Sequence, residues 1–157
     1  MSKHTVTLRW SRDAARFSGG DYSRAHTWAF DGGLEVPASS SPKVVPLPRS
    51  VERAVNPEEA FVAATSSSHM LWFLSLAERR GWIVDRYVDE AEGTLARDAE
   101  GRLAITHVLL RPRVLYGALR PTPDEERALH QLAHDACFIA NSIHSEIRIE
   151  PQRDGLE

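Results

Sequence analysis

The chain has 157 residues, of which 42% are hydrophobic and 26% charged, a balance typical of a globular domain and not of a disordered or fibrous chain. The net charge is −3 with neutral histidines, and no run of lysine or arginine is present. We therefore expect no binding to nucleic acid or to an anionic membrane surface. The single cysteine, Cys137, excludes an internal disulfide framework.

The sequence predicts a soluble cytoplasmic protein. The N-terminus lacks the apolar segment of a signal peptide. The longest apolar stretch, residues 70–77, is much shorter than the roughly 20 residues that a membrane helix requires.

Three β-strands are predicted before the first helix. Residues 5–10 alternate between apolar and polar side chains, as in a half-buried strand. Residues 26–30 and 34–36 form a predicted hairpin, because the sequence Asp-Gly-Gly between them favours a tight turn. Residues 37–50 contain four prolines and are predicted to be an extended loop.

A long helix is predicted from Pro57 to just before Gly81. Asn56 is a good N-cap, and Glu59 three residues later completes a capping box. Glycine is the usual residue just after a helix end. Residues 70–77 are apolar on nearly every side, which predicts a buried helix at the centre of the molecule.

The second half predicts two long strands, a helix and a final strand. The strands cover residues 83–95 and 103–116, and Pro112 requires an edge position or a bulge. The helix follows a cap at Thr122 and has an apolar stripe that includes Cys137, and residues 145–149 form the last strand. The order βββ-α-ββ-α-β predicts an α+β fold with antiparallel sheets.

Three sequence stretches, together with this element order, resemble the OsmC/Ohr family. They are VNPEEAFVAA (55–64), TSSSHMLWFL (65–74) and ACFIANS (136–142). Members of this family reduce organic hydroperoxides with cysteine thiols. The resemblance runs from about Thr5 to Glu150. It implies one OsmC-like domain over residues 1–157, with antiparallel sheets around a long central helix plus a second helix, in an intertwined homodimer.

The resemblance also assigns four site positions. Glu58 matches the acidic residue of the family, Cys137 matches the second, resolving cysteine, and Arg24 is the best match for the N-terminal arginine. Ser68, ten residues after Glu58, stands where the first, peroxidatic cysteine is found. The implied partners are an organic hydroperoxide and a dithiol reductant, and no cofactor or metal is implied.

In this chemistry a thiolate attacks the peroxide and becomes a sulfenic acid, which a second thiol converts to a disulfide. A nearby cation such as Arg24 would lower the pKa of the first thiol, and Glu58 would hold that arginine by a charge-assisted hydrogen bond. A serine hydroxyl is too weak an acid for this role, and its oxygen has no sulfenic oxidation state. We therefore expect a hydroperoxide-reductase scaffold that Ser68 makes inactive.

The spacing of Glu58 and Ser68 has a geometric consequence. Ten residues span about 15 Å along a helix axis, so the two side chains cannot meet within one straight helix. Either the helix breaks, or one of the two residues comes from a second chain.

Other functions stay open at this point. Ser68 can be a replacement of cysteine, natural or engineered, in an enzyme scaffold. The chain can also be a non-catalytic paralogue that binds an apolar small molecule at Met70, Trp72 and Phe73, or a structural dimer without a ligand.

Simpler roles also exist for the four site positions. Serines at 66–68 let a buried helix pack closely, and Cys137 fits an inert core thiol. Glu58 fits a helix-dipole residue and Arg24 fits an ordinary surface residue.

A second group of residues, Glu126, His130 and His134, has a spacing of four that permits metal binding. Because these residues lie opposite the apolar stripe and lack a clear fourth ligand, we favour a solvated helix face.

Overall fold

The computed structural model describes residues 1–13 and 15–153. It divides into two compact units, Met1–Ala60 and Phe61–Glu157. The first long helix, α1, begins in the first unit and continues in the second.

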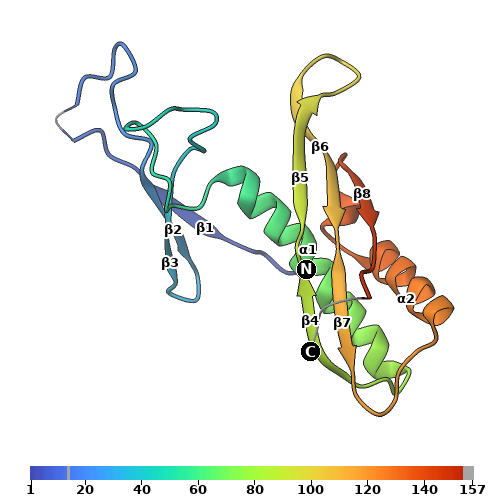
Figure 1. The fold of residues 1–157 in the computed structure, drawn as a ribbon. Helices are drawn as coiled ribbons and strands as arrows, with labels where there is room; N and C mark the ends of the chain where they lie inside the picture. Colours follow the sequence, from blue (N-terminus) through green and yellow to red (C-terminus); the bar gives the residue numbers. More distant parts are fainter. Residues whose placement is uncertain (14, 154–157) are drawn as a thin grey trace. The chain divides into compact units, whose positions relative to one another are not determined.

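The first unit contains a three-stranded antiparallel sheet (Figure 1). Its strands, in spatial order, are β1 (Val6–Arg9), β2 (His26–Phe30) and β3 (Glu35–Ala38). The predicted hairpin is confirmed: the N–H of Gly33 donates to the Phe30 carbonyl at 3.0 Å, and Gly33 has a φ of 86°, which favours glycine. Because β3 reaches Ala38, the loop predicted from residue 37 begins two residues later.

Helix α1 spans Pro57–Arg79, close to its predicted bounds. The capping box is present: the N–H of Glu59 donates to Asn56 Oδ1 at 2.9 Å, and the N–H of Asn56 donates to Glu59 Oε2 at 3.2 Å. Just past the helix end, Gly81 has a φ of 74°, the left-handed conformation that stops a helix.

The burial of α1 differs from the prediction. A single stripe of side chains, one every fourth residue, is buried: Thr65, His69, Phe73 and Ala77. Leu71, on another face, is 60% exposed. The expectation of burial on nearly every side is therefore wrong for one chain by itself, and α1 keeps an uncovered apolar surface.

By length and composition, α1 could also cross a membrane. It has 23 residues and an 18-residue window with a mean hydropathy of 1.2, so the expectation that no segment is long enough is wrong. The prediction counted only uninterrupted apolar residues, whereas the alanines at positions 60, 63 and 64 extend the apolar composition of the helix beyond that stretch. The core helix of a soluble protein meets the same criteria.

In the second unit, each of the two long predicted strands is divided in two. The four resulting strands are β4 (Val84–Asp89), β5 (Glu92–Arg97), β6 (Leu103–Leu110) and β7 (Pro112–Tyr116). The breaks lie beside each other, because the carboxylate of Asp89 accepts the N–H of Arg111 at 2.6 Å. Pro112, which has no N–H, starts a strand after the break, where proline is tolerated.

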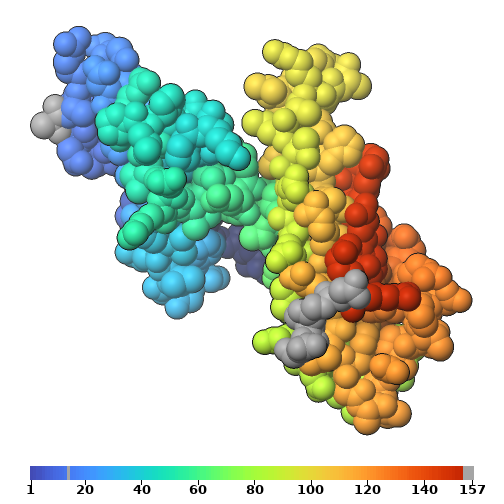
Figure 2. Space-filling view, in the orientation of Figure 1, coloured from blue at the N-terminus to red at the C-terminus, as the bar shows by residue number. Residues whose placement is uncertain are grey.

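These strands form two small sheets. β4 pairs with β7, and β6 lies between β5 and the last strand, β8 (Glu146–Ile149). β6 and β8 are parallel, whereas the prediction was antiparallel throughout. The parallel direction follows from the helical connection that returns the chain to the same end of the sheet. The two strands lie side by side in Figure 2.

Helix α2 (Pro123–Ala136) begins at the predicted cap, Thr122, and is followed by the 3-10 turn η1 (Ala140–Ser142). Its Leu129 and Ala133 are fully buried against Phe73 and Ala77 of α1. Side chains of β4 and β7 cover this cluster. The core of the second unit therefore joins the two helices; Ser68 lies on α1, and Cys137 is the C-cap residue of α2.

Candidate functional site

Ser68 and Cys137 lie in contact, although 69 residues separate them in the sequence. The Cys137 thiol donates a hydrogen bond to the Ser68 hydroxyl, with 3.1 Å between Sγ and Oγ. Cys137 is only 1% exposed, and Ser68 is partly buried. The structure thus brings together the two positions that the family resemblance assigns to the two thiols.

Helix packing and a local turn hold Cys137 in this place. Leu129 and Ala133 lie on one face of α2, and Cys137, the C-cap residue directly after the helix, follows Ala133 at the same interval of four residues; all three are buried. Beyond the helix end, the N–H of Asn141 donates to the Cys137 carbonyl at 3.0 Å, and the N–H of Ala140 points to Cys137 Sγ at 3.5 Å.

Arg24 and Glu58 lie together in the first unit, where both line a cavity of about 410 Å³. The other lining side chains, all aromatic or polar except the proline, are Trp10, Phe17, Tyr22, His26, Ser40 and Pro57. Phe17 and Tyr22 stack with 4.8 Å between ring centroids, and Trp10 meets Tyr22 edge to face at 5.4 Å. The cavity therefore combines an aromatic wall with one cation and one carboxylate.

The hydrogen bond expected between Glu58 and Arg24 is not formed. The Arg24 guanidinium donates instead to the carbonyls of Gly20, at 2.7 Å, and Tyr22, and it lies 3.9 Å from the centroid of the Tyr22 ring. Glu58 Oε2 is buried and, among the described residues, has no hydrogen-bond partner. The expectation overlooked that backbone carbonyls can hold an arginine as well as a carboxylate can.

Helix α1 is continuous from Pro57 to Arg79. Of the two alternatives for Glu58 and Ser68, a break in the helix is therefore excluded. The two side chains stay about 15 Å apart along the helix axis.

A buried histidine pair beside Ser68 was not predicted. His69 Nε2 and His130 Nδ1 are 3.0 Å apart, the ring planes differ by 9°, and each residue is 2% exposed. Burial lowers the pKa of His69 to about 4, helped by the nearby His134. Burial and His69 lower the pKa of His130 to about 3. Both rings are therefore neutral at neutral pH.

The expectation that His130 lies on a solvated helix face is wrong. His130 is two turns before Cys137, so a spacing of seven places it near the same face of α2, and this spacing could have revealed its burial. His69 likewise falls on the buried stripe of α1, four residues before Phe73. His130 was missing from the predicted apolar stripe of the second helix because histidine was counted as polar.

The metal-binding alternative for Glu126, His130 and His134 gains no support. Within residues 1–13 and 15–153, no group of three or more His, Cys, Asp or Glu side chains is arranged to hold a metal ion. His130 faces His69, and Glu126 accepts a hydrogen bond from the Tyr116 hydroxyl at 3.0 Å.

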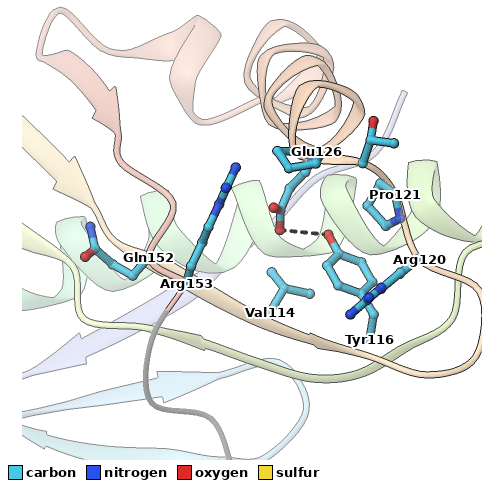
Figure 3. Close-up of a pocket in the computed structure, with 9 residues that line it drawn as sticks. Val114, Tyr116, Arg120, Pro121, Glu126, Gln152 and Arg153 are labelled. Carbon is cyan, nitrogen blue, oxygen red and sulfur yellow. Dashed lines mark hydrogen bonds between the residues drawn. The ribbon is translucent and has the colours of Figure 1, made fainter.

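The Tyr116–Glu126 pair lines a second cavity, of about 490 Å³, in the second unit (Figure 3). Burial, together with the Glu126 carboxylate, raises the pKa of Tyr116 well above its ordinary value. Arg120 and Arg153 also line this cavity, on either side of the pair in the view shown.

The apolar binding site suggested for Met70, Trp72 and Phe73 is not open at its centre. Phe73 is fully buried and stacks on His130, with 4.3 Å between ring centroids. Trp72 meets Phe138 edge to face at 5.4 Å. Phe73 is therefore part of the core between the helices and Trp72 packs against this core, whereas Phe138 is 69% exposed.

Comparisons with known proteins agree with this architecture. A family profile described as OsmC-like protein matches residues 50–152. An OsmC-like protein of unknown function from Vibrio cholerae O1 biovar eltor is 49% identical, with a TM-score of 0.94 over 97% of this chain and 100% of that chain. No curated protein sequence matches the chain.

Two organic hydroperoxide resistance proteins share the fold at lower identity. The one from Elizabethkingia anophelis is 16% identical, with a TM-score of 0.73 and 98% of each chain covered. OhrB of Bacillus subtilis is 18% identical, with a TM-score of 0.70 over 96% of this chain and 98% of that chain. The expected α+β fold of two helices and mainly antiparallel sheets is confirmed. Because the profile covers most of the sequence and the Vibrio relative nearly all of it, this chain belongs to the OsmC-like protein family, whose members are soluble.

Proposed function

We propose that this protein is a thiol-dependent hydroperoxide-reductase scaffold in which Ser68 replaces the peroxidatic cysteine, so that the chain as written does not reduce peroxides. The contact of 3.1 Å between Ser68 Oγ and Cys137 Sγ carries the proposal. A cysteine at position 68 would need only a small shift to form a disulfide bond of about 2.05 Å with Cys137.

The missing step is the first one. With cysteine at position 68, the thiolate would attack one peroxide oxygen, the O–O bond would break, and the alcohol would leave with a proton. The resulting sulfenic acid would react with the Cys137 thiol, which forms the disulfide and releases water. A dithiol reductant would restore both thiols, as expected in a reducing cytoplasm. The Ser68 hydroxyl cannot begin this sequence.

We further propose that two chains form a homodimer and complete each other's sites. Glu58 lies about 15 Å along α1 from Ser68 of the same chain, and Arg24 lines the same cavity as Glu58, so a shared site requires residues from a second copy. Uncovered apolar side chains support an interface, because Leu71 of α1 and Leu8 of β1 are each at least 60% exposed.

A second function, binding of an apolar small molecule without catalysis, is favoured by the aromatic cavity of the first unit. Trp10, Phe17 and Tyr22 offer ring faces and edges to a ligand of aromatic or branched character. This function needs no thiol at position 68.

The proposal is tested by introducing a thiol at position 68. The variant Ser68→Cys is treated with cumene hydroperoxide and examined by mass spectrometry for a disulfide within one chain. Ser67→Cys is the matched control, because Ser67 is the exposed neighbour on the same helix. In the first variant we expect a disulfide between the introduced cysteine and Cys137, and in the control no disulfide within one chain.

If the Ser68→Cys protein folds and its new thiol remains reduced, the peroxidase proposal is wrong and the binding function is preferred. Equal disulfide yields from Ser67→Cys and Ser68→Cys would also contradict the proposal, because the measured contact would then not direct the reaction.

A further inference from the structure

The His69–His130 pair is an unfavourable way to fill a core. One ring donates to the other, which leaves His69 Nδ1 and His130 Nε2 buried without a partner in the described part of the chain. An unpaired buried nitrogen loses its hydrogen bonds to water and gains none in return. Two leucines of similar size would fill the same space without this cost. The pair is therefore not explained by stability.

The position of the pair suggests another role. On α1, His69 follows Ser68 directly, so their side chains leave the helix about 100° apart. On α2, His130 lies seven residues before Cys137, the C-cap residue of the helix, or about 10 Å along the axis. Two hydrogen bonds therefore join the helices: His69–His130 and Cys137–Ser68. They leave α1 in different directions and reach the second helix about two turns apart.

Apolar contacts do not fix this geometry alone. Leucine, alanine and phenylalanine side chains form no directional bonds, so the cluster of Phe73, Ala77, Leu129 and Ala133 places no directional restraint on the rotation of α1 about its axis. The His69–His130 bond is directional, and the Phe73 ring covers the other face of His130 at 4.3 Å between centroids. A rotation of α1 would break this bond.

We propose that the His69–His130 hydrogen bond is a positioning device that sets the rotation of α1 and so holds residue 68 against Cys137. The pair does not touch the reacting atoms and is not catalytic. The inference rests on the proposed function for its purpose, because alignment of residues 68 and 137 matters only if they are a reacting pair.

The S–H stretching band in the infrared spectrum tests the inference without any peroxide chemistry. Cys137 is the single cysteine, so the band reports one thiol and its bond to Ser68. Ser68→Ala removes the acceptor and provides the reference for an unbonded thiol. We expect the double variant His69→Leu/His130→Leu to move the band toward this reference while its thermal midpoint stays equal to that of the wild type or rises. The variant His130→Asn keeps an amide group, which can donate or accept, near the Nδ1 position and should show most of the wild-type band.

Leu129→Ala is the matched control, because it removes buried volume next to His130 and leaves both hydrogen bonds intact. It should lower the thermal midpoint without moving the band. If the leucine double variant keeps the wild-type band, or loses stability as Leu129→Ala does, the pair is structural and the inference is wrong. If the leucine double variant does not fold, His130→Asn decides the question. The inference is wrong if the asparagine variant then shows the band of an unbonded thiol. None of these results depends on whether Ser68→Cys reacts with peroxide, so the two proposals can fail separately.

Discussion

A hydroxyl and a thiol meet at 3.1 Å between Ser68 and Cys137, and the difference of one atom separates an inert pair from a redox pair. The site positions at this scale came from the family resemblance, and the structure brings Ser68 and Cys137 into contact as that resemblance implies. The absence of a hydrogen bond between Glu58 and Arg24 could not be predicted in this way. Arg24 can donate to a carboxylate or to backbone carbonyls, and the fold of residues 20–24 offers it carbonyls.

The buried histidines predict a loss of stability in mild acid. Their pKa values fall from 6.5 in the unfolded chain to about 4 and about 3 in the folded chain. Between pH 6.5 and 4 the unfolded state therefore binds protons that the folded state does not. Each histidine should lower the free energy of unfolding by about 1.4 kcal/mol per pH unit as pH falls through this window. Urea denaturation at several pH values measures the slope.

The variant His69→Leu/His130→Leu is the control for this slope. It should retain the acid sensitivity of the carboxylates and lose the part that begins near pH 6.5. Identical slopes for the variant and the wild type would show that the pair does not resist protonation. His134, which also lowers the pKa of His69, is unchanged in both proteins.

Among the elements, helix α1 was predicted most closely, because its start and stop depend on local residues: the Asn56 capping box and Gly81. The strands of the second unit were predicted less well. A break at Arg111 depends on a carboxylate 22 residues away, and the parallel pairing of β6 and β8 depends on the path of α2 between them. Neither interaction leaves a periodic pattern in the sequence.

The contact between α1 and β5 predicts a sensitive glycine. A Cβ atom on Gly93 would lie 2.5 Å from Val62 Cγ2, so Gly93→Ala must displace either the Val62 side chain or the strand. We expect a loss of about 1–3 kcal/mol in the free energy of unfolding, measured by urea denaturation. Gly32→Ala is the control, because a Cβ there meets nothing within 4 Å. Equal stability of the two variants would contradict the described packing.

At the scale of the whole molecule, the proposed dimer predicts complementation between two inactive proteins. The variant Ser68→Cys/Arg24→Met has the thiol but lacks the arginine, and the wild type has the arginine but lacks the thiol. If the site joins two chains, mixed dimers pair the introduced thiol of one chain with Arg24 of the other. Refolding the two proteins together should then give peroxidase activity that neither has alone.

Sedimentation at micromolar concentration accompanies this experiment and should show a dimer. A stable monomer would rule out the shared site. If the protein is a dimer but the mixture shows no activity, then Arg24 and the thiol of one site come from the same chain, or Arg24 does not belong to the site.

The proposed function requires that the peroxidase architecture is present and lacks only its first sulfur. Steady-state consumption of cumene hydroperoxide with dithiothreitol, measured for the wild type and for Ser68→Cys in parallel, tests it most directly. We expect that the wild type does not exceed the rate without protein, and that Ser68→Cys turns over and loses this activity when Cys137 is also replaced by serine. Turnover by the wild type that disappears on Cys137→Ser, or a folded Ser68→Cys protein without turnover, would contradict it.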